Sequence, residues 1–218
     1  MGEPESLAEV EPLEEHIRRH SYDRLIMLSD GVYAIATTLA AIEVKLPHGE
    51  TLSAMLRAGQ GQLGAYALSF LLTAVYWLQH RDLFARLQRA DQAITLLTLA
   101  QLCLVALIPA AIHAVYSGGI SGGAFQVYLV LVAVIGLVNF GMWAYAEARG
   151  TLFHPAVPRL YRWQRLVTTG SAPVLLLPAL LLPLDEAGYV ILPGALALLA
   201  LRSGLLPRIV DRHPQHMA

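Results

Sequence analysis

A pair of polar residues lies inside an apolar stretch near the start of the chain. Residues 24–47 read RLIMLSDGVYAIATTLAAIEVKLP, which has the length and composition of a membrane-spanning helix, yet Ser29 and Asp30 lie a quarter of the way along it. An acid within a membrane span is costly and is by default a candidate functional residue. Near a helix end, however, Asp30 is also able to pair with an arginine, and Arg24 and Arg81 are both within plausible reach.

The aliphatic residues of this stretch fall on a different face of the helix from the polar pair. With Ile35 set at zero and a turn of about 100° per residue, Ser29 and Asp30 lie at about 120° and −140°. The face around zero carries an aliphatic stripe with a threonine on its shoulder, formed by Ile35, Leu39, Ile42 and Thr38. Such a stripe more often packs against helices or lipid than lines a pore, so periodicity alone assigns it no transport role.

The whole chain has the composition of an integral membrane protein. Of its 218 residues, 56% are hydrophobic and only 14% are charged, and its mean hydropathy is +0.54. The formal net charge of −1 gives no basic surplus, which argues against a nucleic-acid partner. The single cysteine excludes a disulfide within the chain. The partner that this composition predicts is the lipid bilayer.

Runs without charged residues predict six membrane-spanning helices and therefore an all-α fold. A bilayer core requires about 20 mostly apolar residues per helix. One charge-free run is long enough for two helices, and its glycine-rich segment YSGGISGG at 116–123 predicts the turn between them. The predicted spans are approximately 24–46, 58–80, 92–115, 123–147, 164–184 and 187–206. They form a predicted domain of residues 21–206, between an acidic polar tail at 1–20 and a short tail at 207–218.

The distribution of basic residues predicts the orientation of these spans. With the N-terminus in the cytoplasm, thirteen of the fifteen lysines and arginines lie in cytoplasmic segments, and only Lys45 and Arg57 lie outside. Cytoplasmic loops of membrane proteins carry an excess of Lys and Arg. We therefore predict a multi-pass protein with both termini in the cytoplasm.

The sequence lacks the motifs of several functional classes. It contains no His-Glu-x-x-His, no Gly-x-Ser-x-Gly, no P-loop and no dinucleotide fingerprint, so we predict no enzyme activity, catalytic residue, metal site or cofactor. It has no regular arginine ladder and no Thr-Val-Gly-Tyr-Gly filter sequence. His113 and Asn139, in the third and fourth spans, are interpreted as hydrogen-bonding residues between helices.

The first span carries a longer pattern, which resembles the signature of a known family. Residues 24–39, RLIMLSDGVYAIATTL, are similar to the motif Arg-x-x-x-Phe-Ser-Asp-Gly-Val-Phe-Ala-Ile-x-x-Thr-Leu of the transmembrane protein 175 family, the lysosomal potassium channels and their bacterial relatives. Ile42 and Pro47 stand where that family often has an aliphatic residue and a proline. Leu28 and Tyr33 replace two phenylalanines of the motif, and the hydroxyl of Tyr33 needs a hydrogen-bond partner.

The resemblance implies a potassium-permeable channel of the bacterial single-repeat form, in the cell membrane of a bacterium. It further implies a homotetramer of six-helix subunits whose first helices surround a central pore. The pore-lining positions of the family correspond to Ile35, the narrowest, and to Leu39, Ile42 and Thr38. The positions that brace the helices of each subunit correspond to Arg24, Ser29 and Asp30.

Rings of isoleucine and leucine from four subunits predict a hydrophobic gate. From Ile35 to Ile42 the helix rises about 10.5 Å, and so apolar a constriction excludes water when it is narrow. Without a carbonyl filter, the selectivity for K⁺ over Na⁺ and other monovalent cations is expected to be modest and to follow the smaller dehydration cost of K⁺. The hydroxyl of Thr38 either coordinates the ion partially or bonds within the helix, and the sequence leaves both alternatives open.

Two further residues have alternative interpretations. Glu43, near the outer end of the first span, either contributes to an acidic ring at the outer mouth or is a solvated interfacial charge. His80, in the second span, is either a partner of Asp30, through which pH would enter gating, or an ordinary interfacial histidine. For the protein as a whole, the alternatives to a channel are a secondary transporter with a midplane binding site and a non-conducting membrane scaffold.

Overall fold

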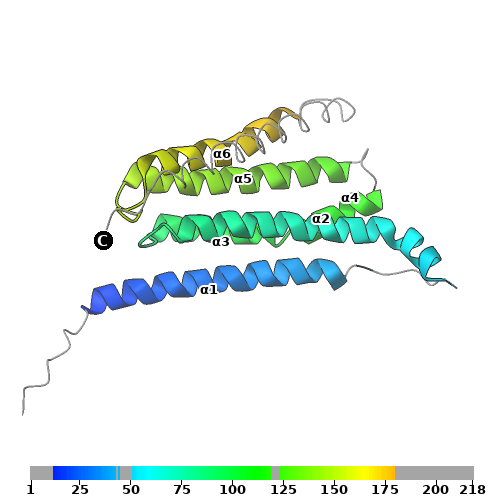
Figure 1. Cartoon of the computed structure of the whole chain (residues 1–218), viewed down its shortest axis with the longest axis horizontal. Coiled ribbons are helices and arrows are strands. Elements are labelled where there is room, and N and C mark those ends of the chain that lie inside the picture. The colour runs from blue at the N-terminus through cyan, green and yellow to red at the C-terminus, as the bar shows by residue number, and fades with distance from the viewer. Residues whose placement is uncertain (1–11, 43, 45–50, 119–122, 180–218) are drawn as a thin grey trace, which may run out of the picture.

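The regular elements of the structure, a computed structural model, are all α-helices in the part of the chain that it describes, which comprises residues 12–42, 44, 51–118 and 123–179. The helices are α1 (Leu13–Ile42), α2 (Leu52–Phe84), α3 (Gln92–Val105), α4 (Ile108–Gly118), α5 (Gly123–Arg149) and α6 (Arg159–Ala179). They form an elongated bundle in which α1, α2 and α5 run along one long axis (Figure 1). The predicted all-α fold is confirmed.

Helix α1 begins eleven residues before the predicted span and within the predicted polar tail. Its first amides are satisfied by the carbonyl of Pro12, which accepts from Glu15 at 2.9 Å and His16 at 3.1 Å. The acidic residues Glu14 and Glu15 in the first turn favour a helix N-terminus. Residues 13–20 of the predicted polar tail are therefore helical, because absence of charge delimits the bilayer rather than the helix.

Helix α2 also exceeds its predicted span of 58–80 at both ends. Thr51 caps its start, where the hydroxyl accepts a 3.3 Å hydrogen bond from the amide of Ala54. The helix continues through Arg81 and Asp82 to Phe84, since polar residues at the membrane boundary are compatible with helical backbone. The apolar part long enough to cross a membrane runs over 59–84.

The third predicted span, 92–115, is interrupted. Helix α3 ends at Val105 and α4 begins at Ile108, so two residues interrupt the helical backbone within the predicted span. The cause is Pro109, which has no amide to donate and whose ring clashes with the carbonyl four residues earlier. Together α3 and α4 still make one apolar stretch over 92–117 that is long enough to cross a membrane.

Helix α5 coincides closely with the predicted span 123–147, and it is the third stretch that is long and apolar enough to cross a membrane. Helix α6 begins at Arg159, five residues before the predicted start of the fifth span. The end of that span, the sixth predicted span at 187–206 and the tail at 207–218 lie outside the described residues. The six described helices are thus not the six predicted spans.

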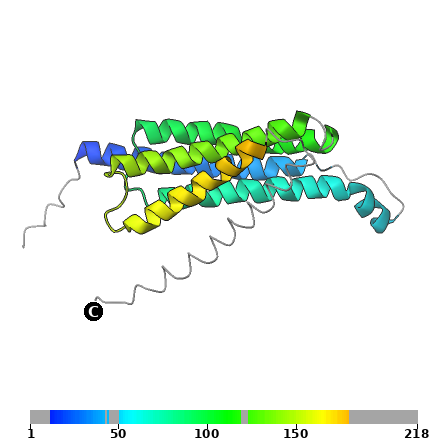
Figure 2. The same cartoon turned by 90° about the horizontal axis from the view of Figure 1, so that it is seen from above.

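The helices are arranged so that α1 and α6 lie on opposite sides of the bundle (Figures 1 and 2). Helix α1 packs against α2, α3 and α4, whereas α6 packs on α5. Two apolar clusters hold the layers together. The first cluster lies at the end of the bundle that carries the α2–α3 and α5–α6 connections. It includes Leu25, Leu83, Phe84, Ile94, Met142, Trp143 and Phe153. The other lies farther along α1 and includes Tyr33, Ala36, Tyr76, Leu102, Ile108 and Ile135.

Candidate functional site

Helix α1 buries one face against its own subunit. The buried positions on this face are Leu25, Ser29, Tyr33 and Ala36, of which Ser29 is 0% exposed and Ala36 1%. Their spacing of four, four and three residues is that of a single stripe along an α-helix. They pack mainly against α2 and, through the two apolar clusters, against α3. This packing fixes the rotation of α1 about its own axis.

A second face of α1, which is exposed, carries the four residues predicted to line a pore. The exposed fraction is 58% for Ile35, 46% for Leu39 and 73% for Ile42, and Thr38 is also exposed. The single subunit therefore presents an aliphatic stripe that none of its own described helices covers. In a membrane, such a stripe faces lipid, another subunit or an oligomer axis.

The threonines in the middle of α1 bond to the backbone of their own helix. Thr38 Oγ1 donates to the carbonyls of Ala34 at 3.1 Å and Ile35 at 3.0 Å. Thr37 Oγ1 donates to the carbonyls of Tyr33 at 3.1 Å and Ala34 at 2.8 Å. The hydroxyl proton of Thr38 is used in its bonds to the two carbonyls. The lone pairs of the Thr38 oxygen therefore remain available to act as acceptors on the exposed face.

The polar pair of the opening motif divides between two partners. Ser29 Oγ donates a 2.8 Å hydrogen bond to the carbonyl of Leu25, one turn earlier in α1. Asp30 accepts a 2.8 Å hydrogen bond from the indole nitrogen of Trp77 on α2. The guanidinium of Arg81 lies 4.9 Å from the centroid of the same indole. Trp77 is therefore the residue that joins Asp30 to α2.

The predicted network of Arg24, Ser29, Asp30 and His80 is not formed as a single hydrogen-bonded cluster. Arg24 is exposed and makes no ion pair with Asp30 in the described part of the chain, and neither ring nitrogen of His80 has a hydrogen-bond partner there. His80 instead packs against Phe84, with ring centroids 4.3 Å apart, and Tyr33, at 5.6 Å. Of the two alternatives considered for His80, a direct hydrogen bond to Asp30 is not formed, because the longer indole of Trp77, one turn earlier, reaches the carboxylate.

The hydroxyl of Tyr33 also lacks a hydrogen-bond partner among the described residues. It lies buried beside His80, whose exposed fraction is 3%. The interhelical bond predicted for Asn139 is present, since its side-chain nitrogen donates to Gln79 Oε1 at 2.5 Å and links α5 to α2. Glu43 lies outside the described residues. No group of three or more His, Cys, Asp or Glu side chains that would suit a metal ion occurs over residues 12–42, 51–118 and 123–179.

A shallow groove of about 350 Å³ runs between α1 and α2 next to the aliphatic stripe. Asp30, Tyr33 and Thr37 line it from α1, and Phe70 and Trp77 line it from α2. Its surface is apolar except near the carboxylate, so it suits a hydrophobic side chain or an acyl chain better than an ion.

Sequence reasoning missed a charged cluster that joins α2 to α6. Asp82 forms ion pairs with Arg86 at 2.5 Å and Arg165 at 2.7 Å, and it accepts from the hydroxyl of Tyr161 at 3.0 Å. The guanidinium of Arg86 also lies 4.3 Å from the Tyr161 ring centroid. Burial, opposed by the hydrogen bond from Arg165, raises the pKa of Tyr161, so the phenol stays protonated and donates. The only available signal was the presence of these charges at predicted helix ends.

A second polar link joins α3 to α5. Asp91 caps α3 by accepting from the amide of Ile94 at 3.0 Å, and it accepts from the hydroxyl of Tyr145 at 2.7 Å. Arg149 in turn donates to Tyr145 at 2.9 Å. Burial opposes ionisation of Asp91, but the hydrogen bonds from Ile94 and Tyr145 and the charge of Arg149 together lower its pKa.

The profile of a known protein family matches the part of the chain that contains the exposed aliphatic stripe of α1. The profile of the family described as endosomal/lysosomal potassium channel TMEM175 matches residues 24–109, which run from within α1 through α2 and α3 to the start of α4. Among single proteins, a potassium channel of Streptomyces collinus is 32% identical over 141 residues, covering 62% of this chain and 68% of that protein. The endosomal/lysosomal proton channel TMEM175 of Danio rerio is 29% identical over 132 residues, covering 58% of this chain and 25% of that protein.

The fold is similar to that of a solved channel. The crystal structure of a lysosomal potassium-selective channel TMEM175 homolog from Chamaesiphon minutus superimposes with a TM-score of 0.66. The match covers 84% of this chain and 97% of that chain, with 22% sequence identity. At this identity the likeness establishes the fold.

Proposed function

Because the chain belongs to the TMEM175 family of ion channels, we propose that it forms a potassium-permeable cation channel whose pore is lined by the exposed face of α1. The observation that carries the proposal is the exposure of Ile35, Leu39 and Ile42 on a helix that buries another of its faces within the subunit. The relative from Streptomyces collinus is named a potassium channel, which favours K⁺ as the permeant ion.

Four subunits around one axis turn this face into a closed wall. A single stripe cannot enclose a pore, and cyclic symmetry is the usual way in which identical subunits enclose an axis. In the proposed homotetramer each subunit contributes six spans, with both termini in the cytoplasm of a bacterial cell. The groove between α1 and α2 then lies beside the neighbouring α1 and accepts its apolar side chains.

The aliphatic rings act as a hydrophobic gate. Between Ile35 and Ile42 the wall extends about 10.5 Å, and at a narrow diameter it expels water and blocks ions. Widening of the rings lets partly hydrated cations pass. Because K⁺ loses its hydration shell more easily than Na⁺, the constriction favours K⁺ modestly without a carbonyl filter.

Thr38 supplies polar oxygen atoms at the edge of this constriction. Its proton is donated to the carbonyls of Ala34 and Ile35, which orients the oxygen lone pairs away from that bond. The two roles considered for Thr38, ion coordination and bonding within the helix, are therefore compatible. Glu43, one residue after α1 ends, is proposed to raise the local cation concentration at the outer mouth.

The proposal is tested by ion flux through liposomes that contain the purified protein and a K⁺ gradient. Ile35→Ala widens the narrowest ring of the pore. Ile35→Asn keeps a side chain of similar size at this ring but makes it polar, so that water enters the constriction. We expect both to raise basal flux and to lower the K⁺/Na⁺ ratio by roughly fivefold, which corresponds to about 1 kcal/mol of barrier. Val167→Ala is the matched control and leaves both quantities unchanged. Val167 is 61% exposed, and its helix, α6, lies on the other side of the bundle from α1 (Figure 1).

The same assay separates the competing functions. A secondary transporter gives saturable flux that depends on a coupled solute, and a non-conducting scaffold gives no flux in any variant. A proton channel, as the relative from Danio rerio is named, dissipates a pH gradient when K⁺ is absent. Native mass spectrometry in mild detergent gives the oligomeric state, and a monomer contradicts the pore.

A further inference from the structure

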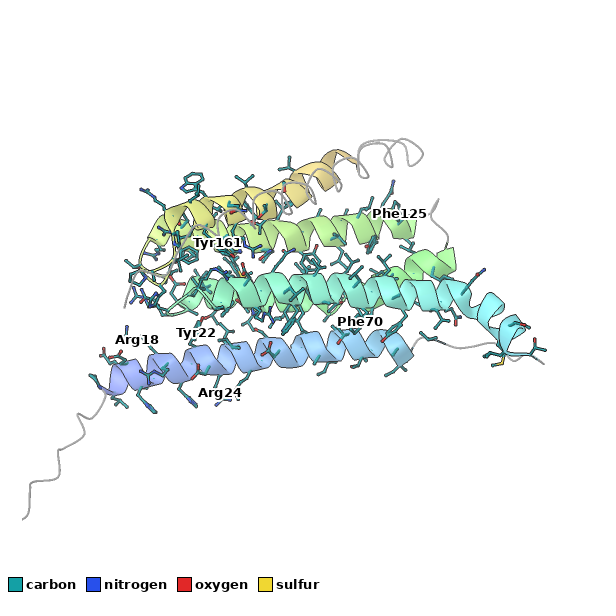
Figure 3. The ribbon with its side chains drawn as sticks, in the orientation of Figure 1. Arg18, Tyr22, Arg24, Phe70, Phe125 and Tyr161 are labelled. Carbon is teal, nitrogen blue, oxygen red and sulfur yellow. The ribbon has the colours of Figure 1, made fainter. Side chains whose placement is uncertain are left out.

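We propose that Arg24 projects into the inner mouth of the pore, where its four copies form a ring of positive charge that slows the entry of cations from the cytoplasm. This role depends on the proposed function, in which four α1 helices surround one axis. It differs from the bracing of helices within one subunit that the family resemblance implied for this position. Figure 3 shows Arg24 on the side of α1 that faces away from the other helices.

Arg24 belongs to the same face of α1 as the aliphatic stripe. With Ile35 at zero and a turn of about 100° per residue, Arg24 lies at about −20°, the same angle as Ile42. Helix α1 is unbroken over Leu13–Ile42, so this angular relation holds along its length. Four α1 helices that turn Ile35 toward a common axis therefore turn Arg24 toward it as well.

The part of this face between Arg24 and Ile35 is not covered by the described helices of the subunit. Arg24 is exposed, and Leu28, which follows one turn later at about 20°, is 49% exposed. At Gly31, at about −40°, an added Cβ atom would meet no atom within 4 Å. The exposed face therefore continues from Arg24 to the predicted constriction at Ile35.

The side chain of Arg24 makes no ion pair or hydrogen bond within residues 12–42, 51–118 and 123–179. The carboxylates closest to it in the sequence belong to another side of α1. On the same wheel Asp23 lies at about −120° and Asp30 at about −140°. Asp30 also accepts the hydrogen bond from Trp77. The guanidinium charge is therefore not neutralised by these neighbours.

Arginines that join helices at the same end of the subunit do meet carboxylates. Arg165 of α6 pairs with Asp82 of α2 at 2.7 Å, and Arg162 of α6 pairs with Glu147 of α5 at 3.0 Å. Bracing of this kind requires a partner on another helix, and the described helices of the subunit give Arg24 none. Its charge is therefore available to act on ions in the pore mouth.

The position of Arg24 suits a barrier to entry rather than a part of the constriction. It precedes Ile35 by eleven residues, or about 16.5 Å along the helix, and it begins the predicted span 24–46. The guanidinium therefore lies at the membrane boundary, where the pore mouth contains water. A ring of charge at a pore mouth changes the local ion concentration, and a ring of arginines lowers that of cations.

Dissolved salt screens such a ring. The Debye length is about 10 Å at 0.1 M salt and about 3 Å at 1 M salt. The effect of Arg24 on cation entry is therefore expected to be strong in dilute salt and weak in concentrated salt. An effect that came from the packing of helices would not follow ionic strength in this way.

Single-channel currents through the full-length protein in planar lipid bilayers test this role. In Arg24→Gln we expect the K⁺ conductance to rise about two- to fivefold in about 0.1 M KCl and by less than about 1.5-fold in about 1 M KCl. Arg24→Lys keeps the charge and should match the wild type, although lysine lacks the two-pronged geometry of a structural arginine pair. Arg159→Gln, which removes an exposed arginine at the start of α6, is the matched control and leaves the conductance unchanged.

Distances between spin labels test the ring without measuring conduction. Cys103, which is exposed, is first replaced in the variant Cys103→Ser. One label is then attached to Arg24→Cys or, as the control, to Arg159→Cys. Labels on a tetramer lie at the corners of a square and give two distances in a ratio of about 1.4. Both distances should be shorter for position 24, because α6 lies on the other side of the bundle from α1 (Figure 1).

The outcomes separate this role from the proposed function. If the Ile35 variants alter ion flux while Arg24→Gln conducts like the wild type in dilute salt, the pore stands and the ring of charge is overturned. An equal change in Arg24→Lys and Arg24→Gln also overturns the ring, since the shape of the guanidinium and not its charge then matters. Labels as far apart at position 24 as at position 159, or an absence of conduction in every variant, overturn both the ring and the pore lined by α1.

Discussion

The indole nitrogen of Trp77 donates a 2.8 Å hydrogen bond to the carboxylate of Asp30 and thereby joins α2 to α1. Asp30 precedes Ile35 by five residues, or about 7.5 Å along the helix. The bond therefore acts close to the start of the aliphatic stripe. Together with the buried face of Ser29, Tyr33 and Ala36, it sets which side of α1 points away from the subunit.

Trp77→Phe removes the hydrogen-bond donor and keeps an aromatic ring in its place. We expect the free energy of unfolding in detergent to fall by about 1–2 kcal/mol, because the carboxylate loses a charge-assisted bond. Thermal denaturation followed by size-exclusion chromatography measures the change. Trp163→Phe is the matched control, since Trp163 on α6 is 55% exposed. Equal losses of stability in the two variants would argue against a specific bond to Asp30.

The sequence predicted the division of α1 into two faces. A period of about 100° per residue separates Ser29 from Ile35 whatever the surrounding fold. In the structure Ser29 is buried and Ile35 is exposed, but Asp30, the second member of the polar pair, is exposed as well. The family resemblance read from residues 24–39 is confirmed by the matching profile and by the Streptomyces relative. Both predictions depended on local pattern, which a single sequence contains.

Helix ends and side-chain partners were predicted less well. Runs of uncharged residues delimit the bilayer, so they miss the polar start of α1 at Leu13, and the effect of Pro109 on α3 and α4 was overlooked. The partner of Asp30 depends on the rotation of α2, which decides whether Trp77 or His80 reaches the carboxylate. Nothing in the local sequence records that rotation, because the two residues are neighbours on one helical turn.

Thr38→Val removes the hydroxyl while keeping the shape of the side chain. We expect the K⁺/Na⁺ permeability ratio in the liposome assay to fall by roughly two- to fivefold, because an oxygen at the constriction no longer offsets dehydration. Thr37→Val deletes a hydroxyl with the same type of backbone bond on the half-buried side of the helix, and it should leave the ratio unchanged. An equal change in both variants would assign the effect to helix geometry instead of ion coordination.

Asp91 makes the link between α3 and α5 sensitive to acid. Its pKa in the folded protein lies below the ordinary value of 3.8, so the unfolded chain binds a proton more readily than the folded one. Stability contributed by Asp91 is therefore fully present above that ordinary value and is lost as the pH falls through the lower folded pKa.

Asp91→Asn keeps the helix cap but removes this titration. The wild type is expected to be more stable than Asp91→Asn at neutral pH, and the difference should shrink as the pH falls below about 4. Thermal midpoints of both proteins over a pH series measure it. Asp23→Asn, a change at an exposed position on α1, serves as the control and should give a difference from wild type that varies less with pH. A constant difference for Asp91→Asn across the series would show that the carboxylate charge contributes nothing.

Close packing between α5 and α6 depends on a glycine. A Cβ atom at Gly136 would lie 3.2 Å from Cδ of Pro173, which is buried and rigid, so the neighbour cannot easily give way. Small residues at such crossings let membrane helices approach closely. Gly136→Ala is therefore expected to lower the free energy of unfolding by about 1–3 kcal/mol through overpacking.

At Gly141 on the same helix a Cβ atom would meet no atom within 4 Å, so Gly141→Ala should be neutral or raise stability by up to about 1 kcal/mol through helix propensity. Thermal midpoints in detergent measure both variants, and a Gly136→Ala protein as stable as Gly141→Ala would mean that the two helices are not held in close contact at this crossing.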